Sequence, residues 1–173
     1  MLTIGSATIL ARVIAALEGM EIAISANGDA SRFAAYDRPV LTDGAFAGEG
    51  PLAGILAGLD WGFAIGATAL LTIPGDTPFV PRGLAVALSP PPAGAASNGR
   101  VHHLVALWPI ETRIALREHL SRPGSRHVAG FTGAIGMRRV DFPPAAWDSF
   151  LNVNTPADLE AARSFVGVAE GPT

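Results

Sequence analysis

The segment from Ala69 to Pro78 constrains the fold more than any other part of the chain. A run of apolar and β-branched residues ends at a turn-forming Pro-Gly pair, and Asp76 follows that pair directly. Thr77-Pro78 then provides the start of a helix, because proline is favoured at the first helical position. A strand, a turn that carries one carboxylate and a helix are typical of open α/β sheets, which bind ligands at the carboxyl ends of their strands.

Asp76 supports two interpretations. A single carboxylate at a strand end suits Mg²⁺, which usually takes one or two protein carboxylates together with phosphate oxygens and water. Aspartate is also a favoured residue at helix N-caps, so the same side chain can instead cap the helix that follows. The segment alone leaves both interpretations open.

The rest of the chain alternates short strands with amphipathic helices, which predicts a three-layer α/β/α fold with a mostly parallel sheet. Asn98-Gly99 between two strands is a strong hairpin signal. Ser6 is the expected N-cap of the first helix. We expect helices over 9–17, 30–36, 52–65, 78–88, 110–120, 126–132 and 155–166, and strands over 21–26, 39–42, 68–73, 93–98, 101–108, 137–142 and 151–154.

Length and composition narrow the class of protein. The 173 residues fit one domain, which we assign to 1–166, with a flexible tail over 167–173. The chain has no cysteine, no apolar stretch long enough for a membrane span and no basic region ahead of an apolar core at its start, so we expect a cytoplasmic protein with no membrane partner. A net charge of −3 argues against a nucleic-acid partner.

All 12 basic residues are arginines. Arginine suits planar, bidentate recognition of phosphate, whereas lysine supplies a compact and mobile charge. Mechanisms that need a lysine ammonium are therefore excluded for this chain. His102 and His103 are adjacent, so on a strand they face opposite sides and cannot share a metal ion.

Further polar residues follow predicted strands. Asp43 can bond a ribose hydroxyl or assist a metal through water, although Asp-Gly is also a routine turn pair. Asn27 can contact a base or a sugar, and turn propensity explains it equally well. The Gly-rich lead into the helix at Gly50, Pro51 and Leu52 can offer bare backbone amides to an anion, or it can be a simple loop-to-helix junction.

Asn152 and Asn154 lie two residues apart, which places their amides on one face of the expected strand. An asparagine amide both donates and accepts, so it can reach phosphate or metal-bound water. Asn154 also suits the N-cap of the last helix, even where Asn152 is functional.

Taken together and in order, these pieces resemble the molybdenum cofactor guanylyltransferases, a branch of the nucleotidyltransferase superfamily. The similar segments span nearly the whole chain. They are Gly5-Ser6-Ala7-Thr8-Ile9-Leu10, Asp43 ahead of Gly50-Pro51-Leu52-Ala53-Gly54, Asp76-Thr77-Pro78 with Pro81, and Asn152-Val153-Asn154-Thr155-Pro156.

The resemblance implies a Rossmann-like nucleotidyltransferase fold and transfer of GMP from GTP to molybdopterin, with Mg²⁺ and release of pyrophosphate. Asp76 would be the catalytic metal carboxylate, and Asp43, Gly50, Pro51 and Leu52 would contact the nucleotide. The family's nucleotide-contacting asparagine on the second strand corresponds to Ser25, with Asn27 as the nearby amide. Asn152 and Asn154 would lie at the pterin side, and molybdoenzymes or other cofactor-biosynthesis proteins would be partners.

One departure from the family is large. Members of the family begin with a strand and a Gly-rich loop that carries an Arg and a Lys. The strand, the loop, the Arg and the Lys are all missing from the start of this sequence. The first strand lies centrally in that fold, so we expect an unfilled place in the sheet, a longer natural protein and impaired turnover. The alternatives are a non-catalytic relic that acts as a binding module, and a nucleotidyltransferase for cytidylyl groups or sugar phosphates.

Overall fold

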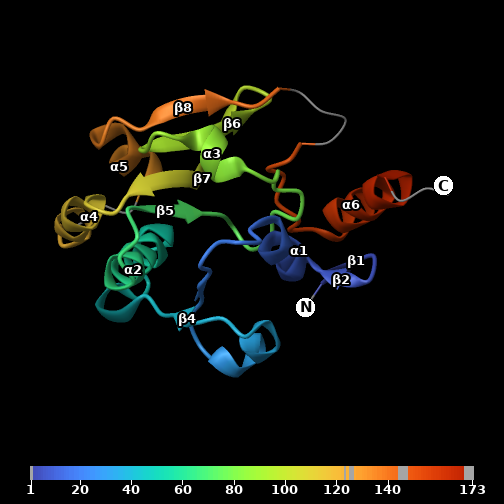
Figure 1. The fold of residues 1–173 in the computed structure, drawn as a ribbon, viewed down its shortest axis with the longest axis horizontal. Helices are drawn as coiled ribbons and strands as arrows, with labels where there is room; N and C mark the ends of the chain where they lie inside the picture. Colours follow the sequence, from blue (N-terminus) through green and yellow to red (C-terminus); the bar gives the residue numbers. More distant parts are fainter. Residues whose placement is uncertain (1, 123, 125–126, 144–147, 170–173) are drawn as a thin grey trace.

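The structure, a computed structural model, describes residues 2–122, 124, 127–143 and 148–169, without the side chains of 166–169. Its main sheet has the strand order β5-β7-β6-β8, formed by Ala69–Thr72, Arg100–Pro109, Ala93–Ser97 and Arg138–Asp141 (Figure 1). β7 is antiparallel to β5 and β6, whereas β6 and β8 are parallel. Three of these four strands therefore run in the same direction.

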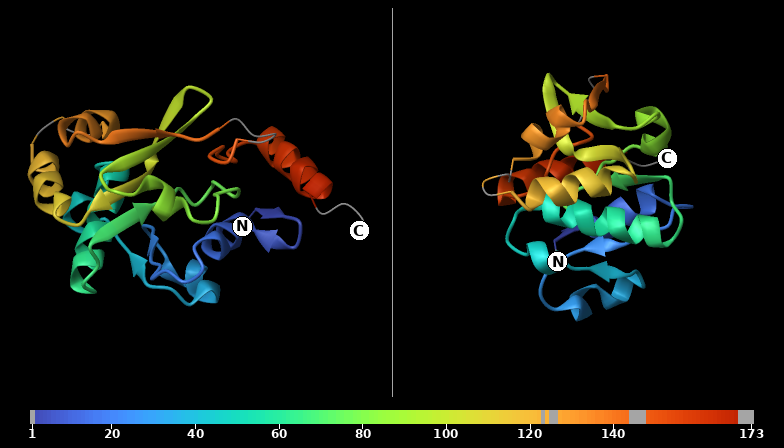
Figure 2. Two further views of the ribbon diagram at one scale, coloured as in Figure 1. Left: turned by 45° about the horizontal axis from the view of Figure 1, so that its top comes forward. Right: turned by 90° about the vertical axis from the view of Figure 1, so that its left-hand side faces the viewer.

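β7 is buried on both faces, and its alternating residues separate the core into two layers. Ala106 and Trp108 pack with the helices α2 (Pro51–Ala64), α4 (Thr112–Leu120) and α5 (Val128–Ala134). Val105 and Leu107 pack on the opposite face with α3 (Leu84–Leu88) and Phe150. Side chains that alternate along one strand thus fill both sides of the sheet. Figure 2 shows the ribbon of the sheet with helices against it.

A second, smaller sheet contains only β3 (Ile24–Ser25) and β4 (Val40–Leu41), which are parallel. The 3₁₀ helices η1 (Ala30–Tyr36) and η2 (Gly44–Phe46) accompany it, and Figure 1 shows this part below the main sheet. The polar turns that follow β3 and β4 lie at the same edge, because the carboxyl ends of parallel strands coincide.

The N-terminal and C-terminal elements pack together. β1 (Thr3–Ile4) and β2 (Ala7–Thr8) form a small antiparallel hairpin ahead of α1 (Ile9–Ala16), and α6 (Pro156–Ala169) lies beside β1. Ile4, Ile9, Val153, Leu159 and Ala162 form the buried cluster between them. None of the described helices combines the length and apolar character needed to cross a bilayer.

Three glycines let α2 approach both sheets. A Cβ built on Gly54 would lie 2.7 Å from Ser25 Oγ of β3, and one built on Gly58 would lie 2.9 Å from Leu70 Cδ2 of β5. A Cβ on Gly62 would lie 2.8 Å from Ile110 Cδ1 and 3.8 Å from the Cβ of Ala67, just before β5 begins. The start of α2 thus lies over the end of β3, and its later turns lie over β5, which runs opposite to α2.

Most expected elements are present, several of them shortened. The hairpin prediction is confirmed, because Asn98 and Gly99 between β6 and β7 have φ values of 49° and 76°. The helix expected over 78–88 is reduced to α3, since Pro81 removes a backbone donor and Gly83 takes a left-handed φ of 76°. The expected cap at Ser6 is wrong, because Thr8 accepts the bond from Ala11 N.

The end of the chain also differs from the expectation. Residues 151–154 form no regular strand, because Val153 N donates to Asp76 O in a turn rather than to a neighbouring strand. Thr155, not Asn154, caps α6: its hydroxyl accepts from Asp158 N while Asp158 accepts from Thr155 N. α6 continues to Ala169, into the range expected as a tail, and residues 170–173 lie outside the described ones.

Candidate active site

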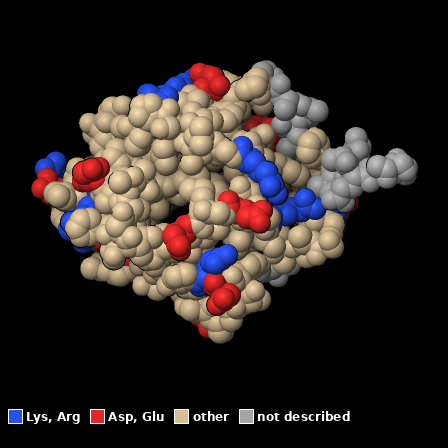
Figure 3. All heavy atoms as spheres, viewed as in Figure 1, with Lys and Arg blue, Asp and Glu red and all other residues tan. Residues whose placement is uncertain are grey.

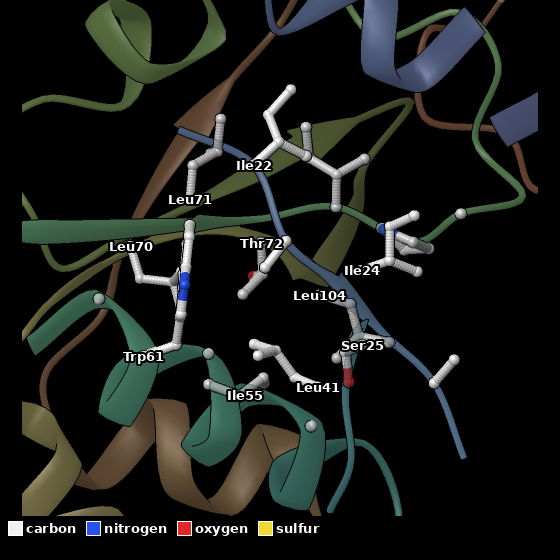
Figure 4. A pocket seen from close by; sticks show the side chains of 18 of the residues that line it. Ile22, Ile24, Ser25, Leu41, Ile55, Trp61, Leu70, Leu71, Thr72 and Leu104 are labelled. Atoms are coloured by element: carbon white, nitrogen blue, oxygen red, sulfur yellow. The ribbon is translucent and has the colours of Figure 1, made fainter. Parts of the chain in front are cut away.

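A cleft of about 920 Å³ separates β3 from β5. α1 covers it on one side and α2 on the other, and Figure 4 shows Ile22, Ile24 and Ser25 across from Leu70 to Thr72. The molecular face drawn in Figure 3 is hollowed near its middle, with acidic and basic side chains interspersed around the hollow. The lining extends from Glu21 and Ala67 to Asn27 and Gly75. It therefore includes the carboxyl ends of β3 and β5, where α/β sheets bind ligands.

Asn27 and Asp43 form a reciprocal pair at this edge. Asn27 Nδ2 donates to Asp43 Oδ2 over 2.7 Å, and Asp43 N donates to Asn27 Oδ1 over 3.1 Å. Each residue follows one of two parallel strands, so the strand register brings the two side chains together. Both line the cleft, and the pair leaves Asp43 Oδ1 and further acceptor capacity for a ligand.

The start of α2 completes this end of the cleft. Gly50 has a φ of 79° and accepts from Ala53 N, and Pro51 occupies the first helical position. Ser25 and Asp43 converge over Gly54, whose built Cβ would lie 3.6 Å from Asp43 Oδ1. The side chain of Leu52 is fully buried in the core, so a nucleotide contact at this position would have to come from its backbone, and the contact stays a prediction.

Asp76 follows β5 in the turn that begins at Pro74. Its Oδ1 is buried and has no hydrogen-bond partner within the described part of the chain. Burial raises the pKa of the Asp76 carboxyl, while hydrogen bonds from its own backbone amide and from Thr77 act in the opposite direction. A half-buried carboxylate with one unpaired oxygen is expensive to ionise unless a cation or donor approaches it.

Thr77 links this turn to the Asn-containing segment near the C-terminus. It is fully buried, and its hydroxyl donates to Asn152 Oδ1 over 3.2 Å. Val153 N donates to Asp76 O over 2.9 Å, so two bonds hold the segments together. No role was expected for Thr77 from the sequence. The only sequence signal for a role of Thr77 was its position between Asp76 and Pro78.

The structure brings some of the expected residues together and separates others. Ser25, Asn27, Asp43, Gly50 and Pro51 line the cleft, together with Pro74 and Gly75 just ahead of Asp76. Asn154 is exposed, and only its backbone amide has an assigned role, as a donor to Asp158.

Asp43 and Asp76 do not meet directly. Asp43 bonds Asn27, and the described residues contain no group of three or more metal-ligating side chains. Asp43 lines the cleft, and so do Pro74 and Gly75, which directly precede Asp76. Any cation at Asp76 would therefore need most of its ligands from a bound phosphate or water.

The fold and this edge define an α/β protein with polar side chains gathered at its strand ends. Residues 1–135 match the model of the MobA-like NTP transferase domain. The chain therefore belongs to this family of nucleotidyltransferases.

Curated relatives are similar over most of their length. A molybdenum cofactor guanylyltransferase from Acidiphilium cryptum (strain JF-5) is 49% identical over 166 residues, covering 95% of this chain and 84% of the relative. A second guanylyltransferase, from Rhodopseudomonas palustris (strain HaA2), is 42% identical, and the match covers 92% of this chain and 80% of the relative.

Solved structures agree on the fold. Molybdopterin-guanine dinucleotide biosynthesis protein A from Archaeoglobus fulgidus superposes with a TM-score of 0.72 at 18% identity, covering 96% of this chain and 89% of that one. 2-C-methyl-D-erythritol 4-phosphate cytidylyltransferase from Thermus thermophilus superposes with a TM-score of 0.57 at 18% identity, and the match covers 95% of this chain and 92% of that one. The expected nucleotidyltransferase fold is confirmed.

Proposed function

We propose that this chain transfers the guanylyl group of GTP to the terminal phosphate of molybdenum-molybdopterin, giving the guanine dinucleotide cofactor and pyrophosphate. The names of the relatives that cover nearly the whole chain support this pair of substrates. Within the structure, the observation that carries the proposal is the buried, unpartnered Oδ1 of Asp76 at the carboxyl end of β5.

Asp76 fits a magnesium ion that is shared with a triphosphate. Its carboxylate oxygen lacks a donor, and burial disfavours its charge, so a cation is the partner that relieves both effects. Mg²⁺ is usually held by one or two carboxylates plus substrate phosphates and water, and one carboxylate is what this turn supplies. When bound, the ion would offset charge on the transferred phosphoryl group.

The chain's own residues would bind and orient the substrates. Ser25, Asn27 and Asp43, which line the cleft near the start of α2, can donate to and accept from the base and ribose of the nucleotide. Asn152 accepts a hydrogen bond from Thr77 and would orient the pterin of the second substrate next to Asp76. The attacking phosphate is largely ionised at pH 7, with a second pKa of about 6, so the reaction needs no general base.

We expect slow turnover. Among the described residues that line the cleft, none is basic, and the sequence has no lysine. Phosphoryl transfer depends on positioning and on cations around the transferred group, and loss of one such cation lowers rates by about 10³-fold or more. The same observation favours the second candidate function, a nucleotide-binding module that has lost turnover.

A pyrophosphate-release assay with molybdopterin, Mg²⁺ and either GTP or CTP tests the proposal. We expect release with GTP, little with CTP, and at least a 10²-fold loss in Asp76→Asn, on the order of the effect of removing one electrostatic stabiliser. Glu118→Gln, at an exposed position on α4, is the matched control and should keep the wild-type rate.

Equal turnover by the wild-type protein and Asp76→Asn would refute the metal assignment. Binding of GTP without any turnover would favour the binding module, and preference for CTP would favour a cytidylyltransferase.

A further inference from the structure

The segment that carries Asn152 is not part of a sheet. Residues 148–155, all of which the structure describes, form no helix or strand, and α6 begins only at Pro156. No ladder of backbone hydrogen bonds therefore fixes the place at which Asn152 meets Thr77. The position of Asn152 depends instead on individual contacts at the two ends of this segment.

The contacts at the end far from Asp76 centre on Asp148. Its Oδ1 accepts from Phe150 N over 3.0 Å, and its carbonyl oxygen accepts from Leu151 N over 3.1 Å. An aspartate side chain that accepts from the amide two residues further on forms an Asx turn. This turn ends one residue before Asn152, so the orientation of the Asp148 carboxylate affects the direction in which the chain reaches Asn152.

Ser97 of β6 holds this carboxylate in one orientation. The Ser97 hydroxyl is buried and donates to Asp148 Oδ1 over 2.7 Å, a distance typical of a hydrogen bond to a charged acceptor. Asn98 Nδ2 donates to the second carboxylate oxygen over 3.3 Å, and His102 Nε2 lies 2.8 Å from Ser97 Oγ. These bonds attach the Asx turn to the β6–β7 hairpin of the main sheet.

Phe150 anchors the middle of the segment in the core. It is fully buried in the layer that contains α3, and its ring centroid lies 5.3 Å from that of His102 and 4.9 Å from that of Phe142. Phe150 and Asn152 are two residues apart, which is at most about 7 Å of extended chain. A displacement of the anchored turn is therefore transmitted to Asn152.

The near end of the segment lies against the turn that carries Asp76. Asn152 Oδ1 accepts from the Thr77 hydroxyl, and Val153 N donates to Asp76 O over 2.9 Å. Figure 1 shows the segment ahead of α6 beside the loop that follows β5. A shift of the Asx turn would move the Asn152 amide relative to the Asp76 carboxylate or break one of these two bonds.

We propose that Ser97 is a positioning residue for the second substrate, because its bond to Asp148 fixes the place of the Asn152 amide beside Asp76. This inference rests on the proposed function, in which Asn152 orients the pterin. Ser97 does not line the cleft, so it acts only through the segment it holds. Its removal should leave the nucleotide contacts that follow β3 and β4 unchanged.

Hydrogen exchange in the substrate-free protein tests the positioning. Ser97→Ala removes the donor and should speed exchange at the Val153 amide by at least about tenfold relative to the Trp108 amide of the inner strand β7. Ile110→Val, in the opposite core layer, controls for a general loss of stability and should leave this ratio unchanged. Ser97→Thr keeps the hydroxyl donor and should also keep the wild-type ratio.

Steady-state kinetics test the assignment to the second substrate. Ser97→Ala should raise the KM for molybdopterin by roughly tenfold, while the KM for GTP stays within about twofold of the wild-type value. An equal exchange ratio in Ser97→Ala and Ile110→Val, or an equal rise in both KM values, would overturn the proposal. Absence of turnover in the wild-type protein would count against the proposed function alone, because the exchange ratio is measured without substrate.

Discussion

The surroundings of Asp76 disfavour the charge on its carboxylate. Its Oδ1 is buried without a partner in the described structure, and burial raises the pKa of the carboxyl above its usual value of 3.8. The folded protein therefore holds this proton more tightly than the unfolded chain. As the pH rises from about 4 through the raised pKa, ionisation of Asp76 lowers the stability of the ligand-free fold.

Replacement of Asp76 by Asn removes this charge at nearly constant shape. We expect Asp76→Asn to have a Tm equal to or higher than that of the wild type at pH 7, and the difference to disappear below about pH 4. Thermal unfolding across this pH range is the measurement. A variant that is less stable than the wild type at pH 7 but equal to it at pH 4 would contradict the desolvation account.

At the scale of elements, a polar cluster ties the β6–β7 hairpin to the segment that carries Asn152. Ser97 Oγ donates to Asp148 Oδ1 over 2.7 Å and lies 2.8 Å from His102 Nε2. Because the serine proton is used toward Asp148, Nε2 of His102 is the donor to Ser97. Burial lowers the pKa of His102, which the Asp148 charge partly offsets, so the ring remains neutral at pH 7.

Asp148 is the acceptor at the centre of this cluster. Burial raises the pKa of its carboxyl, but hydrogen bonds from Phe150 N and Ser97, with smaller contributions from His102 and Asn98, bring the pKa below its usual value. The resulting stabilisation is present above the unfolded pKa and is lost as the pH falls through the folded pKa. The cluster therefore favours the folded state at neutral pH and weakens in acid.

We expect Asp148→Asn to lower the free energy of unfolding by about 1.5–3 kcal/mol at pH 7, the range for hydrogen bonds to a charged group. Urea denaturation measures it. Asp141→Asn is the matched control, since Asp141 has an exposed ion pair with Arg139 and should change stability by less than about 1 kcal/mol. An equal loss of unfolding free energy in the two variants would show that the polar cluster stabilises the fold no more than an exposed ion pair does.

At the scale of the whole molecule, local signals predicted the elements better than their assembly. The Asn98-Gly99 turn between two expected strands was sufficient to predict the β6–β7 hairpin. The cap at Thr8 was missed, because the β1–β2 hairpin displaces the start of α1 by two residues from Ser6.

The candidate site was predictable only where its residues follow strands. Asn27 and Asp43 meet because β3 and β4 are parallel, a consequence of the predicted fold. The bond between Thr77 and Asn152 joins residues 75 positions apart, and no local pattern specifies such a contact. The burial of Leu52 likewise depends on how α2 packs against the main sheet.

The central claim is that the edge of the cleft binds a nucleotide through a cation at Asp76. Calorimetric titration of GTP, with and without Mg²⁺, tests it most directly in the wild-type protein and Asp76→Asn. The account predicts saturable binding to the wild type that requires Mg²⁺, and affinity at least about tenfold weaker in the variant, a difference of about 1.4 kcal/mol. Binding of equal strength in both proteins, or binding that is indifferent to Mg²⁺, would contradict it.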